Sequence, residues 1–153
     1  MTKLVKFSII KLGLDFSYPN QEESPYPPHH HHLDQCLHAS AVVVEDEAYL
    51  FSADCGTGKS THTSLWLKYL ADKNPYILND DKPAIRVTEN GIFAYGTPFS
   101  GKNDINENKK VKVKGICFLE QAPQNSIEKL EISEAFKLFW GQTTDKYFSH
   151  NPE

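Results

Sequence analysis

A glycine-rich run between an apolar strand and an amphipathic helix constrains this chain more than any other feature. Residues 53–61 read Ala-Asp-Cys-Gly-Thr-Gly-Lys-Ser-Thr, directly after the apolar segment 48–52. Behind the run, four residues recur at helical spacing: Thr63, Trp66, Leu67 and Leu70. A strand that passes through a glycine-rich turn into a helix is typical of α/β proteins. The chain is therefore expected to be an α/β protein with a mixed sheet and flanking helices.

The same run matches the phosphate-binding pattern G-x-x-x-x-G-K-[ST], except that Ala53 replaces the first glycine. The two glycines allow the backbone to curl with its N–H groups turned inward, and the helix N-terminus attracts anions. Lys59 is expected to reach the β- and γ-phosphates of a nucleotide, and the Ser60 hydroxyl to ligate Mg²⁺. The predicted nucleotide-binding residues are Gly56, Thr57, Gly58, Lys59, Ser60 and Thr61. An ordinary glycine-rich turn that caps a helix is the alternative.

An acidic pair, Asp80 and Asp81, follows the short apolar strand expected over residues 76–78. A strand that comes after the helix and lies parallel in the same sheet would end beside the phosphates, where ligands bind in open α/β sheets. A carboxylate there can hold Mg²⁺ or accept the proton of an attacking hydroxyl. A turn before Pro83, with no chemical role, is the alternative interpretation of this pair.

Turn signals and apolar runs divide the rest of the chain into short elements. The expected elements are a strand over 4–10, a proline- and histidine-rich loop over 18–32, hairpins over 38–52 and 84–95, a loop over 96–102, a strand over 111–119 and a helix over 133–140 with Ser133 as a possible N-cap. This predicts an N-terminal strand and loop over residues 1–35, followed by one P-loop domain over residues 36–153.

Three motifs in this order resemble the catalytic domain of HPr kinase/phosphorylase, a family that shares its fold with phosphoenolpyruvate carboxykinases. They are His38 ahead of a hairpin, the run 53–61, and the segment Leu-Asn-Asp-Asp at 78–81. The chain is still more similar to small HPr-kinase-related proteins of bacteria, which also carry a Gly-Thr-Pro-aromatic-Ser-Gly-Lys loop, here at 96–102. The resemblance spans roughly residues 36–140 and implies an HPr kinase/phosphoenolpyruvate carboxykinase-like core.

The resemblance also implies roles for individual residues. Asp80 or Asp81 would be the general base that activates an acceptor hydroxyl, with the other near Mg²⁺; Asp81 is the metal-side carboxylate predicted together with Ser60. His38 would lie near the phosphates, and Lys102 would neutralise phosphate charge. The implied cofactors are ATP, or another phosphoryl donor, and Mg²⁺.

The predicted function is ATP-dependent, Mg²⁺-assisted phosphoryl transfer to a hydroxyl of a protein or peptide serine, or of a small hydroxylated molecule. The family's downstream metal-binding acid is missing from residues 93–96, and its C-terminal arginine and helices have no match, so the domain is expected to lack C-terminal elements. These departures keep two alternatives open. One is a non-catalytic nucleotide-binding module or truncated paralogue, and the other is a carboxykinase-type reaction.

Composition bears on partners and location. The 16 Lys and Arg against 20 Asp and Glu give a formal net charge of −4, which argues against a general nucleic-acid binder. No stretch approaches the roughly 20 apolar residues of a membrane-spanning helix. Three cysteines without C-x-x-C spacing are typical of reduced thiols, so a cytoplasmic location without membrane association is expected.

Two surface features suggest macromolecular partners. Lysines at 109, 110, 112 and 114 alternate with valines, which predicts a basic stripe that could dock an acidic protein or peptide acceptor. A solvated edge strand protected by lysines is the alternative. The apolar residues Phe136, Leu138, Phe139 and Trp140 on the last predicted helix allow a homo-oligomer.

Overall fold

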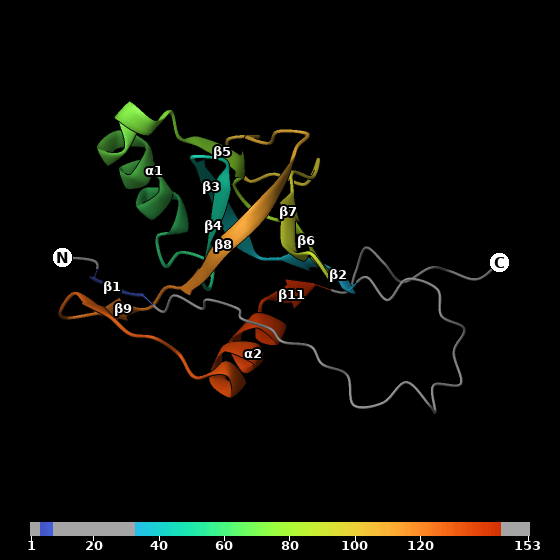
Figure 1. Ribbon diagram of the computed structural model, residues 1–153. Coiled ribbons are helices and arrows are strands. Elements are labelled where there is room, and N and C mark those ends of the chain that lie inside the picture. Colours follow the sequence, from blue (N-terminus) through green and yellow to red (C-terminus); the bar gives the residue numbers. More distant parts are fainter. Residues whose placement is uncertain (1–3, 8–32, 145–153) are drawn as a thin grey trace, which may run out of the picture.

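The computed structural model describes residues 4–7 and 33–144, and it is an α/β protein with a mixed sheet and two α-helices (Figure 1). The predicted α/β class, with a mixed sheet and flanking helices, is therefore confirmed. The elements in chain order are β1 (Leu4–Phe7), β2 (Leu33–Leu37), β3 (Ala39–Val44), β4 (Glu47–Ser52), α1 (Lys59–Tyr69), the short 3₁₀-helix η1 (Ala71–Lys73), β5 (Tyr76–Asn79), β6 (Ala84–Thr88), β7 (Gly91–Tyr95), β8 (Lys110–Phe118), β9 (Gln121–Ala122), β10 (Ser126–Ile127), α2 (Ile132–Gly141) and β11 (Thr143–Thr144).

The main sheet has eight strands in the order β11-β2-β6-β7-β8-β4-β3-β5, and β10-β1-β9 form a separate three-stranded sheet. In the main sheet β2 runs into β3 through the single residue His38, and β5 runs into β6 through residues 80–83. Two backbone hydrogen bonds continue the pairing across this bend: Leu37 N–H donates to Pro83 O at 3.1 Å, and Ala39 N–H donates to Asp81 O at 3.0 Å. The sheet therefore folds over on itself.

Strand directions bring several chain segments to one edge of the sheet. β3 pairs antiparallel with both β4 and β5, so β4 and β5 point the same way with β3 between them. β8 pairs parallel with β4 on its other side. The carboxyl ends of β4, β5 and β8 thus lie along the edge where β3 begins. The predicted direction of the strand after α1 is correct, although that strand does not neighbour β4.

Two apolar clusters hold the layers together. One contains buried residues of the folded sheet together with Ala135 of α2, against which Leu138 and Phe139 also pack. The other lies between α1 and the sheet, where Trp66, Leu67 and Leu70 pack against residues such as Phe51 and Ile77. Thr63 of α1 is buried as well. The apolar stripe predicted for this helix is therefore confirmed.

Both predicted hairpins form. The turn between β3 and β4 places Glu45 at φ 51° and Asp46 at φ 63°, so two residues in the left-handed region close it. Two positive φ angles match the twist of the flanking strands, as in type I′ hairpin turns. The β6–β7 hairpin closes with Thr88 opposite Gly91, which has φ 122°.

Other expectations are corrected or fall outside the described residues. Ser133 is not an N-cap, because α2 begins at Ile132 with Glu131 in the capping position. The lysine-bearing strand β8 is not an edge strand, because it pairs with β7 and β4. The first strand is confirmed for Leu4–Phe7, whereas its predicted continuation to residue 10 and the loop over 18–32 lie outside the described part. In residues 4–7 and 33–144, no helix is long and apolar enough to cross a membrane.

Candidate phosphate-binding site

The glycine-rich run leads from the end of β4 into the first turn of α1, as its sequence predicted. Gly56 has φ 81° and Gly58 has φ 115°, so both adopt the left-handed backbone that glycine tolerates best. Gly58 is the N-cap of α1; no side chain caps the helix, and its first turn carries no acid. The amides of Lys59, Ser60 and Thr61 consequently have no acceptor within the helix. An open helix N-terminus of this kind attracts anionic oxygens.

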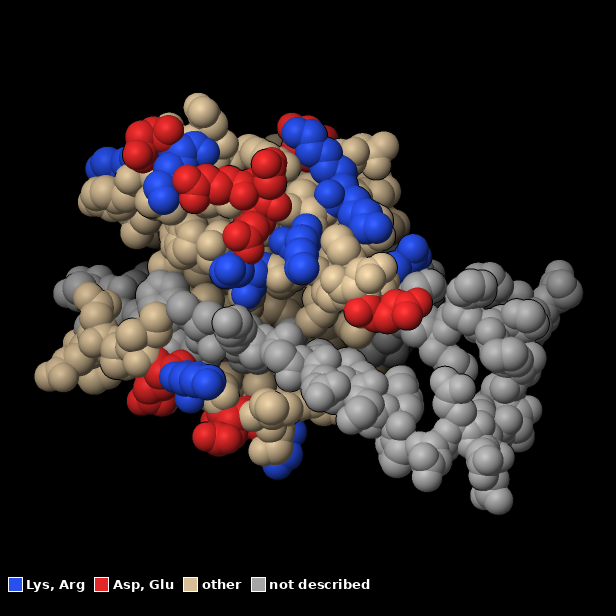
Figure 2. All heavy atoms as spheres, viewed as in Figure 1, with Lys and Arg blue, Asp and Glu red and all other residues tan. Residues whose placement is uncertain are grey.

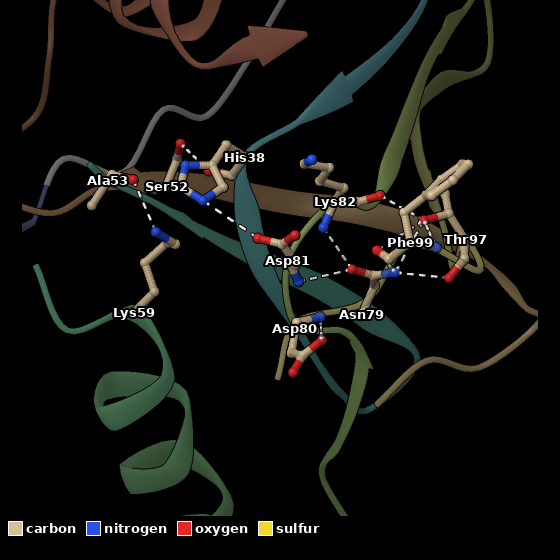
Figure 3. A network of polar contacts seen from close by, with 11 residues as sticks. His38, Ser52, Ala53, Lys59, Asn79, Asp80, Asp81, Lys82, Thr97 and Phe99 are labelled. Carbon is tan, nitrogen blue, oxygen red and sulfur yellow. Dashed lines mark hydrogen bonds and ion pairs between the residues drawn. The ribbon is translucent and has the colours of Figure 1, made fainter. Parts of the chain in front are cut away.

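Lys59 lies across this loop. Its Nζ donates a hydrogen bond to Ala53 O at 3.0 Å, so the side chain turns back from the helix toward the start of the run (Figure 3). Partial burial lowers the pKa of Lys59, while the nearby Cys55, Asp81 and Asp54 oppose that shift. The ammonium therefore lies close enough to the Asp81 carboxylate to sense its charge. Its one hydrogen-bond partner among the described residues is a neutral carbonyl.

The other residues of the run differ in exposure and in hydrogen bonding. Ser60 and Thr61 are exposed, and Thr57 N–H closes a turn onto Asp54 O at 3.2 Å. The carbonyl of Ser60 accepts a hydrogen bond from Ser64 Oγ at 2.7 Å. The Ser60 hydroxyl itself has no hydrogen-bond partner in the described part of the chain. Gly56 borders open space, because a Cβ built there meets no atom within 4 Å.

The acidic pair follows a residue that the sequence interpretation gave no role. Asn79, the last residue of β5, is completely buried. Its Oδ1 accepts the N–H groups of Asp81 at 2.9 Å and Lys82 at 2.7 Å. Its Nδ2 donates to Thr97 O at 3.0 Å, Thr97 Oγ1 at 3.2 Å and Phe99 O at 3.2 Å (Figure 3). The sequence signal that could have found it is an Asn at the start of a turn, where its side chain accepts backbone N–H groups two residues on.

The two carboxylates of the pair have different surroundings. Asp80 Oδ1 accepts the N–H of Gly101 at 2.6 Å, which ties the end of β5 to the loop over 96–102. Asp81 Oδ1 lies 3.4 Å from Nε2 of His38, and both side chains are about a quarter exposed, at 29% and 25%. The structure therefore brings Asp81, but not Asp80, together with His38.

His38 occupies the bend between β2 and β3. Its N–H donates to Gln142 O at 2.8 Å, and its carbonyl accepts the Ser52 hydroxyl at 2.8 Å. Ser52 ends β4 and leads into the glycine-rich run, so this bond connects His38 to the start of that run. In Figure 3, His38 and Asp81 lie on the side of the sheet edge toward which Lys59 projects. The structure thus groups Lys59, His38 and Asp81, which come from three separate segments.

Lys102 stands apart from this group. It is exposed, and within residues 4–7 and 33–144 it has no hydrogen-bond or ion-pair partner. Its loop is nevertheless held close to the acidic turn through Gly101 and Asp80. Gly96 starts this loop and leaves no room for a side chain, because a Cβ there would lie 1.7 Å from Glu107 O.

Two oxygen donors of the site could ligate a metal ion. No three His, Cys, Asp or Glu side chains gather as a metal-binding group in the part of the chain that the structure describes. Mg²⁺ in nucleotide sites is held by one or two protein oxygens and by the phosphates themselves. The exposed Ser60 hydroxyl and the Asp81 carboxylate are oxygen donors of that kind.

Comparisons of this chain with protein-family models, with curated proteins and with solved structures found no match.

Proposed function

We propose that this chain binds a nucleoside triphosphate with Mg²⁺ and transfers the γ-phosphoryl group to a hydroxyl. The observation that carries the proposal is the convergence, at one sheet edge, of an open helix N-terminus with its lysine and of the His38–Asp81 pair. Phosphoryl transfer needs little covalent chemistry from the protein and depends on positioning and charge stabilisation. These three segments supply both requirements in one place.

Phosphate binding would use groups that are without strong partners in the structure. The uncapped amides at the start of α1 would donate to phosphate oxygens. Lys59 would exchange a neutral carbonyl for an anion. Because Lys59 is half-buried, solvent screens its charge less than that of an exposed lysine, which strengthens its attraction to a phosphate. When bound, Mg²⁺ would neutralise negative charge that builds on the phosphates, with the Ser60 hydroxyl as a protein ligand, while the Asp81 carboxylate is assigned to proton transfer.

Proton transfer would use Asp81. Its carboxylate would accept the proton of the acceptor hydroxyl as the hydroxyl oxygen attacks the γ-phosphorus. The new O–P bond forms while the bond to the bridging β–γ oxygen breaks, so the nucleoside diphosphate leaves and the proton stays on Asp81. His38 at 3.4 Å would hold the carboxylate in place. Asp80 is less suited to this role, because its Oδ1 already accepts the Gly101 N–H.

A protein or peptide acceptor is favoured by the basic face of β8. Lys110, Lys112 and Lys114 are exposed on this strand, and Figure 2 shows Lys and Arg side chains along its course with acidic side chains beside them. Lys114 pairs with Glu47 at 3.4 Å, and the ammonium of Lys110 lies 4.4 Å from the ring centroid of Phe93. β7 pairs with β8 at residues 110–112 and β4 pairs with it from Lys112 on, so Lys112 lies between two strands and edge protection does not explain it.

The decisive experiment measures binding and transfer on one preparation. Mg-ATP affinity is measured by calorimetry, and transfer from γ-labelled ATP is measured with a protein serine, a peptide and free serine as acceptors. Oxaloacetate is included as a carboxykinase-type substrate. Transfer to a hydroxyl supports the proposal, whereas binding without transfer supports a non-catalytic nucleotide-binding module. Absence of Mg-ATP binding by the folded chain would refute both.

A further inference from the structure

We infer that Asn79 is a positioning residue that sets the place of the Asp81 carboxylate. The inference depends on the proposed function for its kinetic consequence, but not for its structural one. Asn79 belongs to neither the glycine-rich loop nor the His38–Asp81 pair. It nevertheless controls the backbone from which Asp81 projects.

The acceptor end of Asn79 holds the turn directly. Its Oδ1 accepts two successive N–H groups, those of Asp81 and Lys82, at 2.9 and 2.7 Å. Rotation of the peptide on either side of Asp81 would break one of these bonds inside a buried environment. A partly buried donor left without an acceptor destabilises the fold. The Asp81 backbone is therefore kept in one orientation.

The donor end fixes which way the carboxamide faces. Its Nδ2 donates to three oxygens of residues 97 and 99, so a flipped amide would set its oxygen against those acceptors. Thr97 Oγ1 also donates to Lys82 O at 2.8 Å, which closes a ring of hydrogen bonds around the turn. On the far side, Asp81 O accepts from Ala39 N–H at 3.0 Å, next to His38. The turn is thus braced between the loop over 96–102 and β3, and the Asp81 carboxylate is directed to His38 as a result.

Two variants test this without removing any reacting group. Thr97→Val deletes one hydroxyl and hence its bonds to Asn79 and Lys82, while Thr97→Ser keeps the hydroxyl and is the matched control. Asn79→Asp keeps the acceptor oxygen but loses the donors. Each variant is first checked for a cooperative thermal transition. If Asn79→Asp does not fold, Thr97→Val alone carries the test.

The structural readout is the nuclear magnetic resonance signal of the His38 imidazole, assigned with His38→Gln, with His62 on α1 as an internal reference. Thr97→Val should shift the His38 signals and leave those of His62 in place, because the His38 ring lies 3.4 Å from Asp81, whereas the His62 ring packs beside Phe51 and Trp66. The kinetic readout is a kcat reduced by up to about 100-fold, the size expected for a group displaced by about 1 Å. The KM for Mg-ATP should stay within about twofold, and Thr97→Ser should restore kcat.

Unchanged His38 signals in folded Thr97→Val would overturn the inference, as would a kcat equal to that of Thr97→Ser. If the unaltered chain transfers no phosphate, the proposed function fails, while the His38 signals still decide whether Asn79 positions Asp81. Equal disturbance of His38 and His62 would indicate a general loss of packing and would also count against the inference.

Discussion

Two turns at the same edge of the sheet are built in opposite ways. The glycine-rich loop over residues 53–58 has glycines with positive φ, an uncapped helix start and a lysine bound to one carbonyl. The acidic turn over residues 79–82 is braced by a buried Asn and by bonds to Thr97, Phe99 and Gly101. The first turn leaves the amides at the start of α1 without a capping side chain, whereas the second engages Asn79 and Asp80 in hydrogen bonds and holds the Asp81 carboxylate 3.4 Å from His38 Nε2.

The difference fits the two steps of the proposed reaction, which are phosphate binding and proton transfer. A loop that binds an anion through its backbone must leave N–H groups without internal acceptors, because those groups are the binding site. A carboxylate that takes a proton must be held at a defined position, and a satisfied hydrogen-bond network provides that rigidity. Substitutions in the first turn should therefore weaken nucleotide binding, while substitutions in the second should slow transfer.

The largest expected effect separates the two neighbouring carboxylates. Asp81→Asn should lower kcat by about 10²–10⁴, the usual size for loss of a general base, with Mg-ATP affinity largely retained. Asp80→Asn keeps an oxygen that accepts the Gly101 N–H and should change kcat much less. Steady-state kinetics and calorimetry on both variants check this. Equal losses of kcat in the two variants would contradict the proposed division between them.

The stability of the part of the fold around α1 should depend on pH through His62. Burial lowers the pKa of His62 to about 4, and its Nε2 accepts the Trp66 indole N–H at 3.1 Å. Above pH 6.5 the ring is neutral in both states, so stability is complete. Between pH 6.5 and about 4 the unfolded chain gains a proton that the folded chain does not, so the free energy of unfolding falls as the pH is lowered through this window.

Denaturant unfolding of the unaltered chain and of His62→Gln across pH 4–7 checks this expectation. The glutamine variant has no ionisable group at this position, so its stability should depend less on pH in that window. Identical slopes for the two chains would show that His62 does not carry the effect. Because α1 packs on the sheet beside His62, acid should also loosen the glycine-rich loop that precedes this helix.

Lys59→Ala should abolish the stabilisation that Mg-ATP confers on the fold. A ligand at about 100 times its dissociation constant stabilises the native state by about 2.7 kcal/mol, so the loss is easily seen as a thermal shift. The variant itself should fold, because the side chain contributes one hydrogen bond to a carbonyl. Lys68→Ala, at an exposed position in the last turn of the same helix, is the matched control and should keep the full shift.

The smallest expected effect concerns backbone conformation alone. Gly56→Ala meets no steric obstacle, so its cost comes from φ 81° and should be about 1–2 kcal/mol of stability. Mg-ATP affinity should fall as the loop relaxes. Gly141→Ala also enters open space, has no positive φ and should be close to neutral. Chemical denaturation of both variants tests this; similar stabilities would mean that the loop tolerates alanine at residue 56.

Strong local signals made much of the architecture predictable. The strand–glycine–helix unit and the turn residues of both hairpins depend on contacts within a few residues, so their sequence pattern specifies them. The start of α2 was less predictable, because Ser133 has the chemistry of a cap but Ile132 already belongs to the helix. The lysines of β8 suggested an edge strand, because a sequence shows alternation along a strand and not what pairs on either side of it.

By itself, the sequence determined the α/β unit, the glycine-rich loop and the presence of acids after the next strand. Only the tertiary structure decided that Asp81 faces His38 while Asp80 holds Gly101, and that Asn79 braces the turn between them. The physical reason is that adjacent carboxylates have the same local preferences. Each acquires a role only through the partner that reaches it, and those partners come from segments far apart in the chain, brought together when the sheet bends over its core.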